Sequence, residues 1–283
     1  MTNLIYKAAI AARFYAALAM PVHAAEYVFT APPRDAGGDE SEVYKPIADY
    51  LSAVTGKRIV YQYSDNWLTY QDRMRKGEYD LIYDGPHFTS WRIMKLQHEP
   101  LARLPGKLDF VVIARNDNDK IASLKDLNGR TVCGMAPPNL ATLTMYAQYD
   151  NAARQPLVIS TKSFKEAYEM AMAGKCMGAA MSAGFFKKLD KGEAKVLFHS
   201  AGMPNQAFSA GPRFTDEDKT KMSEALLAPE ARAKMVKFFE MFSKDKDLVK
   251  ASKGEYDGLT VLLKDVYGFD IAQANLAEIK AGK

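Results

Sequence analysis

Hydrophobic positions along the first third of the chain alternate between the period of a strand and the period of a helix. An apolar strand is predicted over 27–30, and the residues after it recur at helical spacing until Gly56, which suits a helix end. A second strand is predicted over 58–63, a helix over 67–76 and a third strand over 79–83. This order favours a parallel, doubly wound α/β sheet, in which ligands lie beyond the carboxyl ends of the strands.

The pattern changes after an apolar strand over 110–114, where a polar turn at 116–119 separates it from a new series of elements. Strands are predicted over 131–134, 157–160 and 177–181, and helices over 139–149 and 164–173. Beyond Phe208 the spacing predicts helices near 216–228, 229–242 and 256–267 and no further strand. We therefore expect two α/β lobes with a helical C-terminal tail: residues 26–113 and 210–283 form lobe 1, and residues 114–209 form lobe 2.

The first 25 residues have the three parts of a secretory signal peptide. Lys7 lies in the short N-terminal segment, an apolar run extends over 8–22, and the small residues at its end are Val22, Ala24 and Ala25. We expect export to the periplasm, with cleavage after Ala24 or Ala25. Arg13 interrupts the apolar run and leaves an uncleaved anchor or an amphipathic N-terminus open as alternatives.

Composition and charge describe an ordinary folded domain. Of 283 residues, 48% are hydrophobic and 25% are charged, which is far from the composition of a disordered chain. The formal charge of +4 becomes +4 − 2 = +2 without the first 24 residues, which hold two cations and no acid. Because the remaining charges of both signs are interspersed, we expect no nucleic-acid partner.

The two cysteines, Cys133 and Cys176, form an even pair in a chain expected to be exported. Such a pair favours a disulfide. Two buried thiols remain the alternative, and the pair lacks the spacing of a zinc site, so no metal or other cofactor is expected.

The chain lacks the common phosphate-loop, dinucleotide-binding, zinc-protease and serine-hydrolase motifs, so we expect no enzymatic activity. Polar and aromatic residues instead gather where predicted strands end and helices begin. The alternative roles are packing for Trp67, turn formation for Asp84, a hydrogen-bonded structural role for His87 and a surface ion pair for Arg34. The candidate ligand-binding residues are Arg34, Asn66, Trp67, Tyr83, Asp84, His87, Asn139, Thr142 and Ser182.

Four stretches of the chain resemble the phosphonate-binding, PhnD-like branch of periplasmic substrate-binding proteins of ABC transporters. They are residues 31–34, 44–51, 77–86 and 123–132. The resemblance implies the type II periplasmic-binding fold, with two lobes joined by crossings near Val112–Arg115 and Phe208–Pro212. It also implies a monomer that closes on a small ligand and delivers it to an ABC permease.

The resemblance implies an oxyanion ligand, with Arg34 for charge, Asn66 and Asn139 for hydrogen bonding, Trp67 as a wall and Asp84 and His87 as orienting groups. Pro137 and Pro138 replace the hydroxyl residues usual in this family and remove backbone N–H donors. Phosphonate, phosphite and other oxyanions therefore stay open as ligands. Two alternatives to the importer role remain: a sensor for a membrane histidine kinase, and a ferric-iron receptor using Tyr63, Tyr83 and His87.

Overall fold

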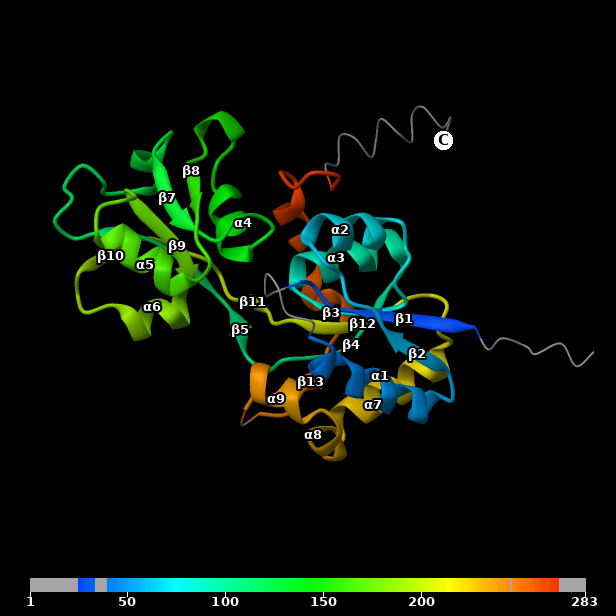
Figure 1. Ribbon diagram of the computed structural model, residues 1–283. Coiled ribbons are helices and arrows are strands. Elements are labelled where there is room, and N and C mark those ends of the chain that lie inside the picture. The colour runs from blue at the N-terminus through cyan, green and yellow to red at the C-terminus, as the bar shows by residue number, and fades with distance from the viewer. Residues whose placement is uncertain (1–24, 34–39, 245, 270–283) are drawn as a thin grey trace, which may run out of the picture.

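The computed structural model describes residues 25–33, 40–244 and 246–269. The chain forms two α/β lobes that lie side by side, each built around its own sheet (Figure 1). The predicted signal peptide falls outside the described residues, apart from Ala25. Within the described ranges, no helix combines the length and the apolar character that crossing a membrane requires.

Lobe 1 begins with three βα units, as the sequence predicts. Helix α1 buries its apolar face, including Ile47 and Leu51, and ends at Gly56, whose φ of 69° is left-handed. Strand β1 pairs in parallel with both β2 and β3. The elements are β1 (Glu26–Thr30), α1 (Ser41–Thr55), β2 (Arg58–Tyr61), α2 (Trp67–Arg75), β3 (Leu81–Asp84) and α3 (Pro86–Leu96).

Strands from distant parts of the chain complete the sheet of lobe 1. They are β4 (Glu99–Arg103), β12 (Ala207–Ala210) and β13 (Val249–Lys250), and the strand order is β13-β4-β12-β3-β1-β2. The expectation that no strand follows the C-terminal helices was wrong, because β13 pairs antiparallel with β4. Strand β13 has two residues, which is too short for a periodic signal.

Lobe 2 contains the five-stranded sheet β10-β6-β9-β7-β8. Its strands β7, β8 and β9 and helices α4 and α5 follow the predicted alternation, while β10 was not predicted. The elements are β6 (Phe110–Arg115), η2 (Leu124–Leu127), β7 (Thr131–Gly134), α4 (Leu140–Tyr146), η3 (Ala152–Arg154), β8 (Leu157–Ser160), α5 (Phe164–Met172), β9 (Gly178–Ser182), α6 (Ala183–Leu189) and β10 (Ala194–His199).

The disulfide between Cys133 and Cys176 is confirmed. Cys133 lies in β7 and Cys176 just before β9, and these two strands pair in parallel. The Cα atoms are 5.7 Å apart, which is a normal separation for a disulfide. The bond closes a loop that contains α4, β8 and α5, and so restricts the unfolded ensemble of this lobe.

Two short strands connect the lobes. Strand β5 (Lys107–Leu108) pairs antiparallel with β11 (Met203–Pro204) in a separate two-stranded sheet. The crossings therefore lie earlier in the chain than the positions predicted near Val112–Arg115 and Phe208–Pro212. The reason is that β6 belongs to the sheet of lobe 2 and β12 to the sheet of lobe 1, which the apolar pattern of each strand alone cannot reveal.

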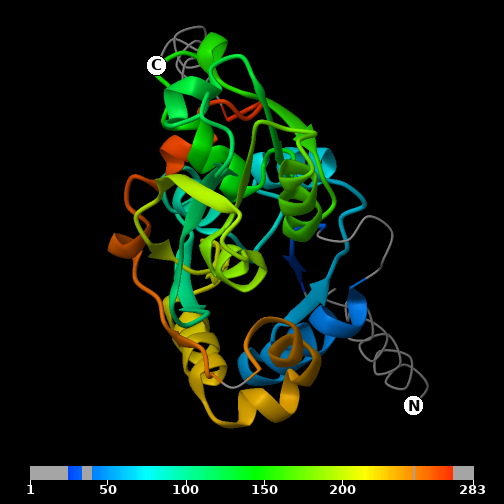
Figure 2. The ribbon, with the colours of Figure 1, turned by 90° about the vertical axis from the view of Figure 1, so that its left-hand side faces the viewer.

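The segment from α7 onwards mainly braces lobe 1. Helices α7 (Asp216–Leu227), α8 (Glu230–Lys234) and α9 (Val236–Phe242) lie with α1 on one face of its sheet, and α2 and α3 cover the other (Figures 1 and 2). The turns η4 (Lys253–Tyr256) and η5 (Leu259–Leu263) then pack against α3. Beyond η5 the chain also touches lobe 2, where Gln155 Nε2 donates to Asp265 Oδ2 at 2.8 Å.

Candidate functional site

A cleft of about 990 Å³ lies between the lobes. It forms where the carboxyl ends of β1 and β3 in lobe 1 face those of β7, β8 and β9 in lobe 2. In open parallel sheets, ligands bind at this edge. Lobe 1 contributes Pro32, Trp67, Gly85, His87 and Phe88, the crossings contribute Leu108 and Gln206, and lobe 2 contributes Phe110, residues 135–140, Ser160, Thr161, Lys162, Phe164, Ser182 and Phe185.

The wall of lobe 1 is mostly aromatic. Trp67 is the first residue of α2 and lies half-buried beside Phe88 of α3, with ring centroids 6.3 Å apart and planes 26° from parallel. Phe88 in turn contacts the ring of His87 at 4.1 Å between centroids. Helix α3 begins immediately after β3 because Pro86 occupies its first turn, where a missing N–H costs nothing.

The wall of lobe 2 carries most of the polar side chains. Ser160 ends β8 and Ser182 ends β9, so both lie where their strands turn into helices. Lys162 follows in the turn before α5, and its side chain is exposed. Within the described part of the lining, Lys162 is the only Lys or Arg, and there is no Asp or Glu.

Four of the predicted residues line this cleft: Trp67, His87, Asn139 and Ser182. Asn139 also caps α4, because its Oδ1 accepts a hydrogen bond from the backbone N–H of Ala141 at 3.0 Å. These four predicted residues come from both lobes and lie in one cleft. Their contact with a ligand stays a prediction.

Four other candidates do not line the cleft. Asn66 is an exposed residue that caps α2 by accepting from Thr69 N at 2.8 Å. Thr142 is fully buried, and its hydroxyl donates to the Met135 carbonyl at 2.6 Å. Tyr83 and Asp84 point to opposite faces of β3, as successive strand residues must, and both are fully buried. The ninth candidate, Arg34, lies outside the described residues.

Tyr83 belongs to the core of lobe 1. Its ring packs against Phe208, Phe238 and Phe242 at centroid distances of 4.7 to 5.2 Å. The ferric-iron hypothesis therefore loses a tyrosinate ligand at the cleft. Among the residues that the structure describes, no three His, Cys, Asp or Glu side chains gather where they could hold a metal ion.

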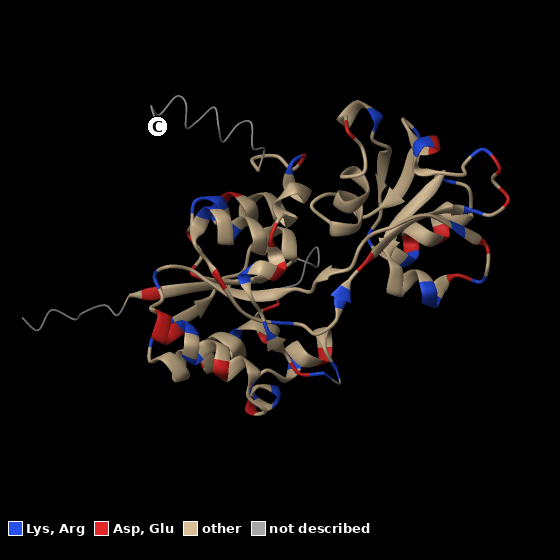
Figure 3. Ribbon diagram, turned by 180° about the vertical axis from the view of Figure 1, so that it is seen from behind, with Lys and Arg blue, Asp and Glu red and all other residues tan. Residues whose placement is uncertain are grey.

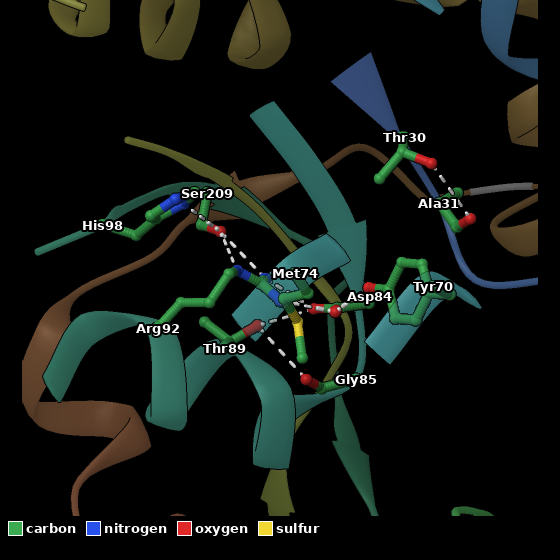
Figure 4. A network of polar contacts seen from close by, with 10 residues as sticks. All are labelled: Thr30, Ala31, Tyr70, Met74, Asp84, Gly85, Thr89, Arg92, His98 and Ser209. Carbon is green, nitrogen blue, oxygen red and sulfur yellow. Dashed lines mark hydrogen bonds and ion pairs between the residues drawn. The ribbon is translucent and has the colours of Figure 1, made fainter. Parts of the chain in front are cut away.

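Asp84 forms a buried ion pair with Arg92 (Figure 4). Its two carboxylate oxygens accept from Arg92 Nη1 and Nη2 at 2.6 and 2.7 Å, and neither side chain is exposed. The hydroxyl of Tyr70 donates to the same carboxylate, and Ser209 accepts from Arg92. Asp84 is thus a structural residue that ties β3 to α3 just before the turn that carries His87.

His87 is the buried polar side chain of the cleft, with 4% of its surface exposed. Burial lowers its pKa from 6.5 to about 4, against the charge of Asp84 and a weak contact with the Pro138 backbone, which both favour the charged form. Neither ring nitrogen has a well-aligned hydrogen-bond partner among the described residues. At neutral pH the imidazole is therefore uncharged and can offer one donor and one acceptor to a bound molecule.

Several lining residues were missed by the sequence argument, above all Lys162, Phe164 and Phe185. Lys162 and Phe164 follow the strand predicted over 157–160, so the strand-end rule that selected Ser182 would also have selected them. Phe185 stands three residues beyond Ser182 in α6. Gln206 had no such signal, since the chain arrives at the cleft there through a crossing rather than through a βα turn.

Comparison with solved structures shows the same architecture in other organisms. A Xanthomonas citri protein bound to ATP aligns with a TM-score of 0.63 at 14% identity, over 84% of this chain and 95% of that one. A PhnD1 protein of Prochlorococcus marinus in complex with methylphosphonate gives 0.62 at 13% identity, over 85% and 98%. A binding-protein component of an ABC phosphonate transporter from Pseudomonas aeruginosa gives 0.55 at 15%, over 91% and 98%.

These likenesses establish the type II periplasmic-binding fold. No curated protein sequence matches the chain. The family model for the periplasmic substrate-binding protein of phosphonate ABC transporters, however, matches residues 29–256, which include both lobes and both crossings. The chain therefore belongs to this family of substrate-binding proteins, which are not enzymes but bind a small ligand and work with an ABC permease.

Proposed function

We propose that this protein captures a small solute carrying a phosphonate-like oxyanion between its lobes and presents it to an ABC permease. The observation that carries the proposal is the charge of the cleft: within the described lining, Lys162 is present and carboxylates are not. Over the rest of both lobes, cations and acids are interspersed (Figure 3). The cleft therefore favours an anion although the surface as a whole does not select one.

Hydrogen-bond donors for the anion come mainly from side chains. The backbone at Pro137 and Pro138 has no N–H to offer before α4, so the hydroxyls of Ser160 and Ser182 supply donors beside the Lys162 ammonium. Neutral His87 adds a donor from lobe 1. Because these groups lie on both lobes, one anion can bridge them and favour a closed arrangement.

Export and oligomeric state belong to the same proposal. The signal-like segment over residues 1–25 supports secretion to the periplasm, where a disulfide such as that of Cys133 and Cys176 persists. The proposal includes a monomer, which is supported by the fact that both walls of the cleft come from one chain.

Replacing Lys162 by Gln is expected to weaken binding of methylphosphonate about 10-fold, because the charge-assisted contact is lost while the polar side chain remains. The matched control is Lys165→Gln, since Lys165 lies on the exposed side of α5 and pairs with Glu169 at 3.7 Å. Isothermal calorimetry on the wild type and both variants measures the three dissociation constants. Equal affinity in all three proteins would contradict the proposed anion site.

A further inference from the structure

Aromatic rings occupy both sides of the cleft. In lobe 1 the half-buried Trp67 lies beside Phe88, and in lobe 2 Phe164 contacts Phe185 with ring centroids 5.6 Å apart. Phe185 leaves 50% of its surface exposed, although it is a large apolar residue next to a polar site. Apolar surface that lines a cleft in this way is a common mark of a ligand with an apolar part.

The polar groups are gathered on one side of the same cleft. Ser160, Lys162 and Ser182 all belong to lobe 2, near the carboxyl ends of β8 and β9. Opposite them, the described lining from lobe 1 offers Pro32, Trp67 and Phe88 with the uncharged His87. Lobe 2 thus combines the acid-binding groups with an aromatic pair, whereas the lining from lobe 1 is mainly aromatic, and this combination matches a ligand that has both an apolar ring and an acidic group.

The volume of the cleft also favours a ligand that is larger than a simple oxyanion. Its volume of about 990 Å³ lies at the upper end of the range of roughly 300 to 1,000 Å³ found for sites that enclose drug-sized ligands. An inorganic oxyanion or a methylphosphonate would fill a small part of this space and leave the aromatic rings in contact with water. Closure of the lobes would reduce the space but would also bring the two aromatic pairs closer together.

We propose that the natural ligand is an aryl acid: a flat apolar ring that lies between Trp67 of lobe 1 and Phe185 of lobe 2, joined to one acidic group that meets Lys162. This inference rests on the proposed function and narrows its ligand class. The ring stacks on the aromatic side chains of both walls and is buried between them, and the acidic group accepts hydrogen bonds from the donors of lobe 2. The shared chemistry of arylphosphonates and arylcarboxylates meets this description, so the head group is decided by experiment.

The test compares phenylphosphonate, methylphosphonate and benzoate by isothermal calorimetry on the full chain. We expect phenylphosphonate to bind at least about 10-fold more tightly than methylphosphonate, because its ring buries additional apolar area. Trp67→Leu and Phe185→Leu should each weaken phenylphosphonate about 10-fold and change methylphosphonate less than about 2-fold. Trp91→Leu is the matched control, since Trp91 packs against Phe269 away from the cleft.

The possible outcomes separate three claims: the anion site, the aromatic body of the ligand and its phosphonate head group. If methylphosphonate binds as tightly as phenylphosphonate, or the wall variants weaken both equally, the aromatic-ligand inference is overturned and the proposed function stands. If benzoate binds and phenylphosphonate does not, the aromatic body is supported and the phosphonate head group is overturned. If none of the three probes binds, the anion site and the inference built on it both fail.

Discussion

Asp84→Asn is expected to lower the free energy of unfolding by roughly 3 to 5 kcal/mol, which is the usual effect of removing one partner of a buried ion pair. Asparagine keeps the size of the side chain but loses the charge. Arg92 then remains fully buried without a counter-charge, because Asp84 supplies both of its carboxylate contacts. Urea unfolding followed by circular dichroism measures the change.

Asp49→Asn is the matched control for that experiment. Asp49 pairs with Lys45 on α1 at 2.6 Å, but the two side chains are 63% and 66% exposed, so water already screens the interaction. We expect a change below about 1 kcal/mol there. A loss at Asp84 as small as the loss at Asp49 would show that the buried pair does not anchor α3 to β3.

The second prediction is a loss of folding stability at acid pH that is caused by the protonation of His87. The folded-state pKa of His87 is about 4, below its ordinary value of 6.5, so the unfolded chain binds this proton more tightly than the folded chain. The stability linked to His87 is fully present above pH 6.5 and is lost as the pH falls toward 4. At pH 4.5 this difference amounts to roughly 2 to 3 kcal/mol. Urea unfolding between pH 7 and 4.5 reveals the loss.

His87→Gln should remove this part of the pH dependence, whereas His199→Gln should keep it, because His199 is half exposed and pairs with Asp109 at the surface. His98 is also buried, with a pKa lowered to about 3, and it contributes in the same direction in both variants. The comparison of the two pH profiles therefore isolates His87. Identical profiles for the two variants would contradict the assignment of His87 as a buried neutral residue.

The parts of the fold that could be predicted from the sequence are those with a local signal. Helix α1 repeats its apolar face over 15 residues and stops at a glycine with positive φ, so the helix and its C-terminal end could be predicted. Strands β4, β10 and β12 were not predicted. They pair antiparallel with strands that are distant in the sequence, and they are not flanked by the regular alternation of turns and helices that marks a βα unit. The position of the crossings depended on this pairing, which explains why they were placed too late in the chain.

The site was predictable to the extent that it follows the ends of parallel strands. That rule located Trp67, His87, Asn139 and Ser182 and, applied to the end of β8, would also have given Lys162. It failed for Tyr83 and Asp84, because the face to which a strand residue points depends on the helices that cover each side. The partner that makes Asp84 structural, Arg92, lies on α3 and could be recognised only once the structure had brought the two together.

The central claim is that one ligand is held by both lobes, and small-angle X-ray scattering tests it most directly. The radius of gyration is measured for the wild type alone and with saturating phenylphosphonate, with Lys162→Gln at the same ligand concentration for comparison. The account predicts a smaller radius for the liganded wild type, because the lobes are joined by the β5–β11 crossings and can rotate about them. An unchanged radius at a ligand concentration where calorimetry shows full occupancy would contradict it.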